Sequence, residues 1–298
     1  MFRIFAFISV VVATSLFSAC SSSSSDKVVD LPPDRNKNAT CFPESTFTGI
    51  VGGQRVNPND IDSKKVMMLN IVKDDGLSIC TAAAIAPNVL LTAGHCVTGP
   101  AEKAFVTLYT SLSCESGFDA RVNAVKVSEF VVNEKFNLQM SEDHVENVEG
   151  DLALIFLKET LPAGYPIYKI AQPEHLSVAE PIYFYGYGST RYGNDPKHAN
   201  GATILRKTQL PGSAVTLDVI SKKVRIDQSN GTGICTGDSG GPGLTKIDGE
   251  LEILGVNSYI DGTGQVEKCG GKSVLVLADS YRSWIESKMN ARGASLRH

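Results

Sequence analysis

The apolar residues of this chain fall into short runs that are separated by turns rich in glycine, proline and asparagine. Residues 152–157 are continuously apolar, which is typical of a strand buried on both faces, whereas residues 122–132 alternate only in part. Such runs predict strands over residues 67–72, 84–91, 104–109, 122–132, 152–157, 181–186, 251–259 and 273–278. Many short strands with this punctuation indicate an all-β fold, either a barrel or a sandwich.

One helical pattern lies near the C-terminus. It follows Asp279 and stops at Gly293, and its apolar residues recur at helical spacing: Tyr281, Trp284, Ile285 and Met289. We expect Trp284 to pack this helix onto the β-sheet core.

Residues 1–19 have the features of a signal peptide. Arg3 supplies a positive charge, and residues 4–17 are almost wholly apolar but fall short of the roughly 20 residues that span a bilayer. Residues 16–20 (Leu-Phe-Ser-Ala-Cys) resemble a bacterial lipoprotein cleavage site. This resemblance implies that Cys20 carries lipid and, because Ser21 follows it, that the protein is exported and anchored in the outer membrane. Phe17 is less usual at such a site, so simple secretion is the alternative.

Residues 20–49 contain few apolar positions and are expected to form a lipidated tether and propeptide. Residues 50–298 are long enough for one two-barrel domain or for two ordinary domains. The net charge of −4 and the lack of basic clusters give no indication of nucleic-acid binding.

The chain has seven cysteines, an odd number for an exported protein. If Cys20 carries lipid, six remain, enough for three disulfides in an oxidising compartment. Six cysteines allow 15 connectivities, so their number alone does not choose between them.

Three stretches carry candidate chemistry. Residues 235–242 (Cys-Thr-Gly-Asp-Ser-Gly-Gly-Pro) place Ser239 between glycines, which permit a sharp turn and a close approach of the backbone to a substrate. Residues 91–96 end on His95 and Cys96, and Asp151 opens the apolar run at 152–157. A serine hydroxyl needs a neighbouring base to act as a nucleophile, and a histidine is the usual choice.

In the order His95, Asp151, Ser239, these motifs resemble those of the chymotrypsin-like (trypsin-like) serine proteases. Residues 50–53 (Ile-Val-Gly-Gly) resemble the N-terminus that such zymogens expose on cleavage. The resemblance extends from Ile50 to about Arg292 and implies a fold of two six-stranded barrels with a C-terminal helix.

The resemblance also implies a catalytic triad, with Ser239 as nucleophile, His95 as base and Asp151 as the group that orients His95. Asp143 competes for the third role but has no apolar run after it. The backbone N–H groups of Gly237 and Ser239 are expected to form the oxyanion hole.

Asp238 is expected to pair with the ammonium of Ile50 once the bond after Gly49 is cut, so the full-length chain should be a weakly active zymogen. Glycine before that bond is a departure from the usual arginine or lysine. Either another protease with a preference for small residues activates the chain, or the chain cuts itself.

The position that usually forms the floor of the specificity pocket is Gly233, so no carboxylate is available there for arginine or lysine. Ile234 and Ile260 are expected to narrow the pocket and to favour small aliphatic residues before the scissile bond. The residues expected to line it are Gly233, Ile234, Ser258, Tyr259 and Ile260, and Ser273 is an alternative for the floor.

By the same resemblance, Cys80 pairs with Cys96 and Cys235 with Cys269. Cys41 and Cys114 are then left as the third pair. A calcium-binding loop over residues 109–118 is conceivable by analogy. The histidines show no spacing typical of a metal site, and no cofactor is expected.

The expected partners are protein or peptide substrates, an activating protease, and the membrane through the lipid on Cys20. The alternative function is a non-catalytic binding protein with the protease fold, but such a protein usually lacks a triad or oxyanion residue. An esterase fits poorly, because its histidine normally follows the serine, and only His298 follows Ser239 here.

Overall fold

The computed structural model describes residues 50–57, 60–73, 76–98, 103–107, 124–141, 144–172, 174, 180–188, 205–261, 269 and 271–297. The chain divides into two compact units, Met1–Arg35 and Asn36–His298, and all described residues belong to the second. Several expectations lie outside the described residues: the signal peptide, the tether and propeptide, the calcium-binding loop, Cys20, Cys41, Cys114 and Asp143.

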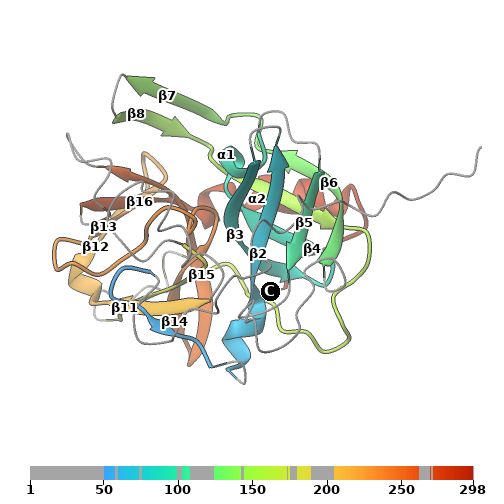
Figure 1. The fold of residues 1–298 in the computed structure, drawn as a ribbon, viewed down its shortest axis with the longest axis horizontal. Coiled ribbons are helices and arrows are strands. Elements are labelled where there is room, and N and C mark those ends of the chain that lie inside the picture. Colours follow the sequence, from blue (N-terminus) through green and yellow to red (C-terminus); the bar gives the residue numbers. More distant parts are fainter. Residues whose placement is uncertain are drawn as a thin grey trace, which may run out of the picture. The chain divides into compact units, whose positions relative to one another are not determined.

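Six antiparallel strands close into a barrel in the order β2-β3-β4-β9-β6-β5 (Figure 1). They are β2 (Val66–Lys73), β3 (Gly76–Ala86), β4 (Val89–Thr92), β5 (Lys103–Thr107), β6 (Ala124–Val132) and β9 (Ala153–Leu157). Closure gives each strand two neighbours, so no edge is left unpaired.

A second sheet of eight strands has the order β1-β11-β10-β14-β15-β16-β13-β12 and lies beside the barrel in Figure 1. Its strands are β1 (Gln54–Arg55), β10 (Ile182–Gly186), β11 (Arg206–Leu210), β12 (Val215–Asp218), β13 (Lys223–Asp227), β14 (Pro242–Ile247), β15 (Glu250–Asp261) and β16 (Lys272–Leu277). A separate hairpin consists of β7 (Asn137–Ser141) and β8 (His144–Glu149).

The helices are short. Within the described ranges, three are 3-10 helices: η1 (Ile61–Lys65), η5 (Gly212–Ala214) and η6 (Ala278–Tyr281). The α-helices are α1 (Gly94–Val97), a single turn after β4, and α2 (Arg282–Asn290) near the C-terminus.

Helix α2 packs against the closed barrel although it follows β16 of the second sheet. Ile285 and Met289 are fully buried in the large apolar cluster that also contains the barrel interior. Trp284 is partly buried against this cluster, and its Nε1 donates a hydrogen bond to Glu134 at 2.7 Å. The predicted C-terminal helix and its packing through Trp284 are confirmed.

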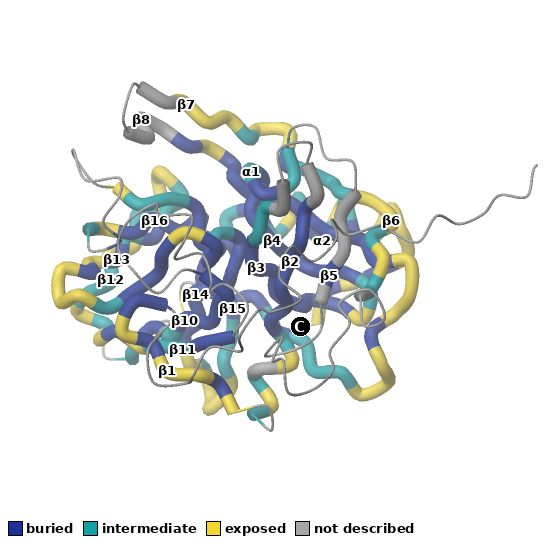
Figure 2. Tube along the Cα trace, viewed as in Figure 1, coloured by how far each residue is buried: buried dark blue, intermediate teal, exposed yellow. Residues whose placement is uncertain are grey.

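Two apolar clusters form most of the interior. The larger one fills the closed barrel, and strands β3 and β4 are buried along most of their length (Figure 2). The smaller one lies under the second sheet and surrounds Ile50, which is fully buried among Ile182, Phe184, Ile234 and Leu275.

The prediction of an all-β fold built from two barrel-like sheets is confirmed, but one predicted strand is wrong. Residues 84–91 do not form a single strand, because Pro87 and Asn88 make the turn between β3 and β4. Strands β7, β8 and β11–β14 were not predicted, since they carry more polar and charged residues than the runs that were recognised.

The described part of the chain contains two disulfides, Cys80–Cys96 and Cys235–Cys269, as the family resemblance implied. The first joins β3 to α1, so it anchors the turn that carries His95. The second joins the segment before Ser239 to the segment before β16.

Replacing Cys80 and Cys96 together by serine should destabilise the fold. The disulfide closes a loop with a sequence separation of 16, and a loop of that size contributes about 3 kcal/mol in the chain-entropy description. Urea unfolding of the Ser239→Ala protein, with and without the two substitutions, measures the difference. An unchanged unfolding midpoint would contradict the expectation.

Candidate active site

His95 lies in the single turn of α1, directly after β4. Its backbone N–H donates to Asp151 Oδ1 at 2.8 Å, and its Nδ1 lies 2.8 Å from Asp151 Oδ2. The carboxylate therefore holds both the backbone and the ring of His95. When Nδ1 carries the hydrogen that it shares with Asp151, Nε2 presents a lone pair and is able to accept a proton.

Asp151 lies just before β9 and is almost completely buried. Ser258 Oγ from β15 also donates to Asp151 Oδ2, at 2.5 Å. Burial raises the pKa of Asp151, but hydrogen bonds from His95 and Ser258, together with the His95 charge, outweigh it and hold the pKa below its ordinary value. The carboxylate is therefore ionised near neutral pH. Ser258, predicted as a pocket residue, is thus a partner of Asp151.

Ser239 lies in the turn that precedes β14 and is partly exposed. Its carbonyl accepts a hydrogen bond from the Thr81 backbone N–H at 2.8 Å, so the turn is attached to β3 of the barrel. His95 Nε2 lies 3.8 Å from Cys96 Sγ. Over the part of the chain that the structure describes, no hydrogen bond joins Nε2 to Ser239 Oγ. Such contacts are often long in the free enzyme and tighten with substrate.

The ligand atoms of Cys80, His95 and Cys96 lie within 4.8 Å of one another, a composition that suits a metal ion. Both sulfurs are already joined in the Cys80–Cys96 disulfide, so neither is available as a thiolate ligand. This cluster is part of the frame around His95 and does not form a metal site.

Two hydrogen bonds to the Asp238 carbonyl fix the orientation of the peptide between Asp238 and Ser239. The Asp238 carbonyl accepts hydrogen bonds from the Gly241 N–H at 2.9 Å and from Asn257 Nδ2 at 3.0 Å. The C=O and N–H of a trans peptide point in opposite directions. Holding this carbonyl therefore turns the Ser239 N–H away from Asn257, as an oxyanion donor requires.

Thr81 holds the neighbouring peptide. Its Oγ1 donates to the Gly237 carbonyl at 3.0 Å and accepts from the Tyr187 N–H at 3.2 Å. Thr81 and Asn257 are both buried, and sequence reasoning missed both. The available signal was a polar residue inside an otherwise apolar strand run.

Gly240 permits the close contact between this turn and the barrel. A Cβ at this position would lie 2.1 Å from Thr92 Oγ1 and 2.5 Å from the Thr81 carbonyl oxygen, and its φ is +78°. A side chain at position 240 would therefore separate the turn from β3.

Asp238 is fully buried behind the turn. Its carboxylate accepts hydrogen bonds from the Gly188 N–H at 2.7 Å and the Cys235 N–H at 2.8 Å. Burial nevertheless raises the pKa of Asp238 from 3.8 to about 7, although the two backbone hydrogen bonds and the charge of Arg206 act to lower it. The carboxylate is thus poorly compensated in this uncut chain.

The other residues that were predicted to line the specificity pocket have different surroundings. Gly233 is bridged to Val51, and Ile260 packs against the disulfide. Ile234 belongs to the apolar cluster around Ile50, and Tyr259 is half-buried on β15. The alternative floor residue Ser273 is buried on β16, opposite Ile226 and Ile260.

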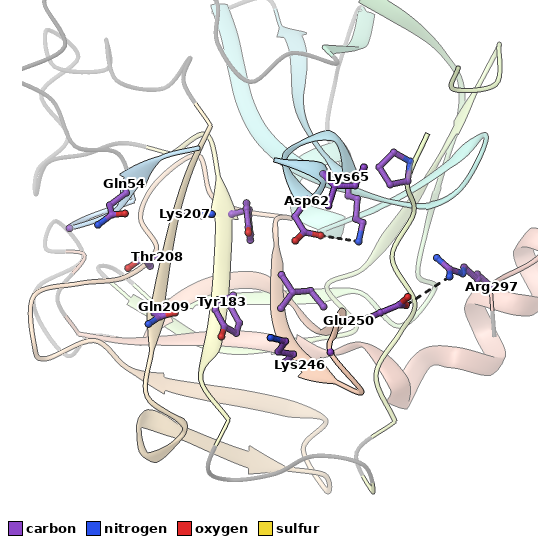
Figure 3. A pocket seen from close by; sticks show the side chains of 16 residues that line it. Gln54, Asp62, Lys65, Tyr183, Lys207, Thr208, Gln209, Lys246, Glu250 and Arg297 are labelled. Atoms are coloured by element: carbon purple, nitrogen blue, oxygen red, sulfur yellow. Dashed lines mark ion pairs between the residues drawn. The ribbon is translucent and has the colours of Figure 1, made fainter. Parts of the chain in front are cut away.

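A cavity of about 750 Å³ lies elsewhere, between η1, strands β10 and β11, and the β14–β15 turn (Figure 3). Ion pairs between Lys65 and Asp62 and between Arg297 and Glu250 lie along its wall. None of the residues of the predicted triad or specificity pocket lines it. The candidate active site is therefore the junction around His95, Asp151 and Ser239.

A closed β-barrel lies beside a second β-sheet, and at their junction a buried aspartate holds a partly exposed histidine near a glycine-rich serine turn. This combination defines the class of the chymotrypsin-like serine endopeptidases. A family model described as Trypsin matches residues 50–285, and the chain belongs to this family.

Known relatives agree with this assignment. The chain is 25% identical to chymotrypsin-like elastase family member 1 of Rattus norvegicus over 263 residues, 83% of this chain and 91% of that protein. It is 26% identical to the cercarial protease of Schistosoma mansoni over 193 residues, 61% of this chain and 70% of that protein. The solved structure of mouse neuropsin, a serine protease, matches with a TM-score of 0.59 and 22% identity over 80% of this chain and all of that one.

Among the described residues, no helix has the length and apolar character needed to cross a bilayer.

Replacing Thr81 by valine should weaken both the fold and catalysis. Valine keeps the shape but leaves the Gly237 carbonyl and the Tyr187 N–H without their side-chain partner, which costs about 1–3 kcal/mol for each buried group left unpaired. We expect kcat to fall more than KM changes, because the loosened peptide, between Gly237 and Asp238, lies between the two N–H groups that are predicted to form the oxyanion hole. Thr216→Val, at an exposed position on β12, is the matched control. An unchanged kcat would contradict the prediction.

The uncut chain should lose stability as the pH rises from about 4 to about 7. In the unfolded chain the Asp238 carboxyl ionises near 3.8, whereas in the folded chain it keeps its proton until about 7. The folded state therefore binds more protons in this interval, and the contribution is present below the unfolded pKa and lost above the folded one. Urea unfolding of Ser239→Ala and of Ser239→Ala/Asp238→Asn at several pH values measures it. Parallel pH dependences for the two proteins would show that Asp238 is not the cause.

Proposed function

We propose that this endopeptidase cleaves peptide bonds through an acyl-enzyme, with Ser239 as nucleophile, His95 as general base and acid, and Asp151 as the orienting group. The observation that carries the proposal is the double hydrogen bond of Asp151 to the backbone and ring of His95. It leaves Nε2 as the ring nitrogen available to the serine hydroxyl.

The chemistry follows from these positions. Ser239 Oγ forms a bond to the scissile carbonyl carbon while His95 takes the hydroxyl proton. The carbon–nitrogen bond then breaks as His95 passes that proton to the leaving amine, and water releases the acyl group by the same steps. The N–H groups of Gly237 and Ser239 stabilise the oxyanion, and Thr81 and Asn257 support the peptides of this turn.

We also propose that cleavage between Gly49 and Ile50 activates the chain. Support comes from Asp238, whose pKa of about 7 reflects a buried carboxylate without sufficient compensation. Ile50 is buried in the apolar cluster that also contains Ile234. A new ammonium at Ile50 would supply a positive charge in the interior and, paired with Asp238, would lower that pKa. The ion pair then stabilises the conformation of the turn that contains Gly237 and Ser239.

Substrate preference is the finer part of the proposal. Small aliphatic residues before the scissile bond are favoured, because Gly233 brings no carboxylate and Ile260 lies against the Cys235–Cys269 disulfide. Two relatives carry the name elastase.

We also propose that the protein is exported, with residues 1–19 as the signal peptide. Lipid on Cys20 would then anchor the protein in the outer membrane. If Cys20 is not modified, the protein would be secreted. The disulfides Cys80–Cys96 and Cys235–Cys269 support an oxidising compartment.

The test combines N-terminal sequencing with labelling by a fluorophosphonate, on wild type and on Ser239→Ala. We expect wild type to begin at Ile50 and to be labelled, and the variant not to be labelled. If the variant also begins at Ile50, a separate protease performs the activation, and if it stays uncut, the chain cuts itself.

Correctly cut wild-type protein that resists labelling would overturn the triad and favour a binding protein with the protease fold. His95→Ala serves as a second inactive variant, since it removes the base but keeps the serine.

A further inference from the structure

We propose that Gln228 closes the floor of the specificity pocket and thereby restricts this enzyme to small, uncharged side chains before the scissile bond. The proposal rests on the proposed protease function. Gln228 belongs to none of the sequence motifs, and it follows directly after β13, with no exposed surface.

The side chain of Gln228 is held by three hydrogen bonds. Its Oε1 accepts from the Ile234 N–H at 2.8 Å, and its Nε2 donates to the Ile234 carbonyl at 3.2 Å and the Cys269 carbonyl at 3.0 Å. Both amide hydrogens are thus used within the protein. The amide joins the segment before Ser239 to the segment around Cys269, the two sides of the predicted pocket.

The amide lies directly beside Gly233, the position that the family resemblance assigns to the floor of the pocket. A Cβ built at Gly233 would lie 2.2 Å from Gln228 Cδ and 2.3 Å from its Oε1. The space that a floor side chain at position 233 would occupy is therefore filled from a different part of the chain. Glycine is required at 233 because the glutamine is already there.

The chemistry of the floor excludes two classes of substrate side chain. A lysine or arginine would be desolvated next to a neutral amide without a counter-charge, which is unfavourable. The adjacent carboxylate, Asp227, is exposed and accepts a hydrogen bond from the Ser229 N–H, so it does not reach this space. A large apolar side chain would have to displace the amide and break its three buried hydrogen bonds. A small apolar side chain brings no charge that would be desolvated and is too short to displace the Gln228 amide.

The test uses activated enzyme that begins at Ile50, and peptides that differ only in the residue before the scissile bond: alanine, valine, leucine, phenylalanine or lysine. Wild type should prefer alanine and valine. In Gln228→Ala the floor is lowered, so kcat/KM for leucine and phenylalanine relative to alanine should rise about tenfold or more, the usual effect of a few added methylenes in a pocket. Gln209→Ala, at an exposed position on β11, should keep the wild-type ratios.

A second variant tests the hydrogen-bond argument. Gln228→Glu keeps the length of the side chain but puts a carboxylate oxygen against the Ile234 and Cys269 carbonyl oxygens, so the floor should loosen and the leucine-to-alanine ratio should rise at high pH, where the carboxyl is ionised. If Gln228→Ala does not fold, Gln228→Asn, which is shorter by one methylene, should shift the leucine-to-alanine ratio in the same direction.

Unchanged ratios in a variant that is still labelled by the fluorophosphonate would overturn the assignment of Gln228. Failure of the protease function has a different signature, since wild type that begins at Ile50 would then neither be labelled nor cleave any of the peptides.

Discussion

The turn that carries Ser239 depends on hydrogen bonds from both sheets. Strand β3 of the closed barrel holds it through the Thr81 backbone and hydroxyl, and strand β15 of the second sheet holds it through Asn257. The Asp151 carboxylate joins the same two sheets, because it binds His95 on one side and Ser258 on the other. The relative position of the reacting groups is therefore set where the sheets meet, and a shift between them would disturb the serine and the histidine together.

Two buried carboxylates near this junction lie in opposite electrostatic states. Hydrogen bonds from His95 and Ser258 compensate Asp151, so its pKa lies below the ordinary value. Asp238 has two backbone N–H partners, yet burial dominates and its pKa is raised to about 7. The first group is ready to stabilise a protonated histidine. The second is only partly compensated, since the charge of Arg206 does not offset burial, and a further positive charge beside it would stabilise it, which is the physical basis for the proposed activation by cleavage.

The specificity pocket shows how a motif and a tertiary contact combine. By family resemblance, the position six residues before Ser239, Gly233, is expected to form the floor, and a glycine there supplies no carboxylate. The Gln228 amide fills the space that a side chain at position 233 would occupy, and its hydrogen bonds to Ile234 and Cys269 hold it there, which is the basis for the proposed floor. The breadth of the pocket therefore depends on a residue whose role is invisible in the linear motif.

Several features of this protein were determined by the sequence alone. The short apolar runs indicate an all-β fold because a buried strand needs only five or six apolar residues, and the local motifs around His95, Asp151 and Ser239 identify the family because glycines and a serine at this spacing are tied to one turn. The pairs Cys80–Cys96 and Cys235–Cys269 followed from the family resemblance. The strands with mixed polar pattern, such as β7 and β12, were missed, since their residues lie partly in solvent and carry no clear alternation.

Only the tertiary structure decided what lies behind the motifs. Thr81, Asn257 and Gln228 carry no distinctive pattern along the chain, and their partners lie at sequence separations of 156, 19 and 41. A hydrogen bond of this kind depends on how β3, β15 and the pocket segments pack in space. The local sequence pattern indicates which residues are buried, but it does not indicate with which distant backbone group each buried polar atom forms a hydrogen bond.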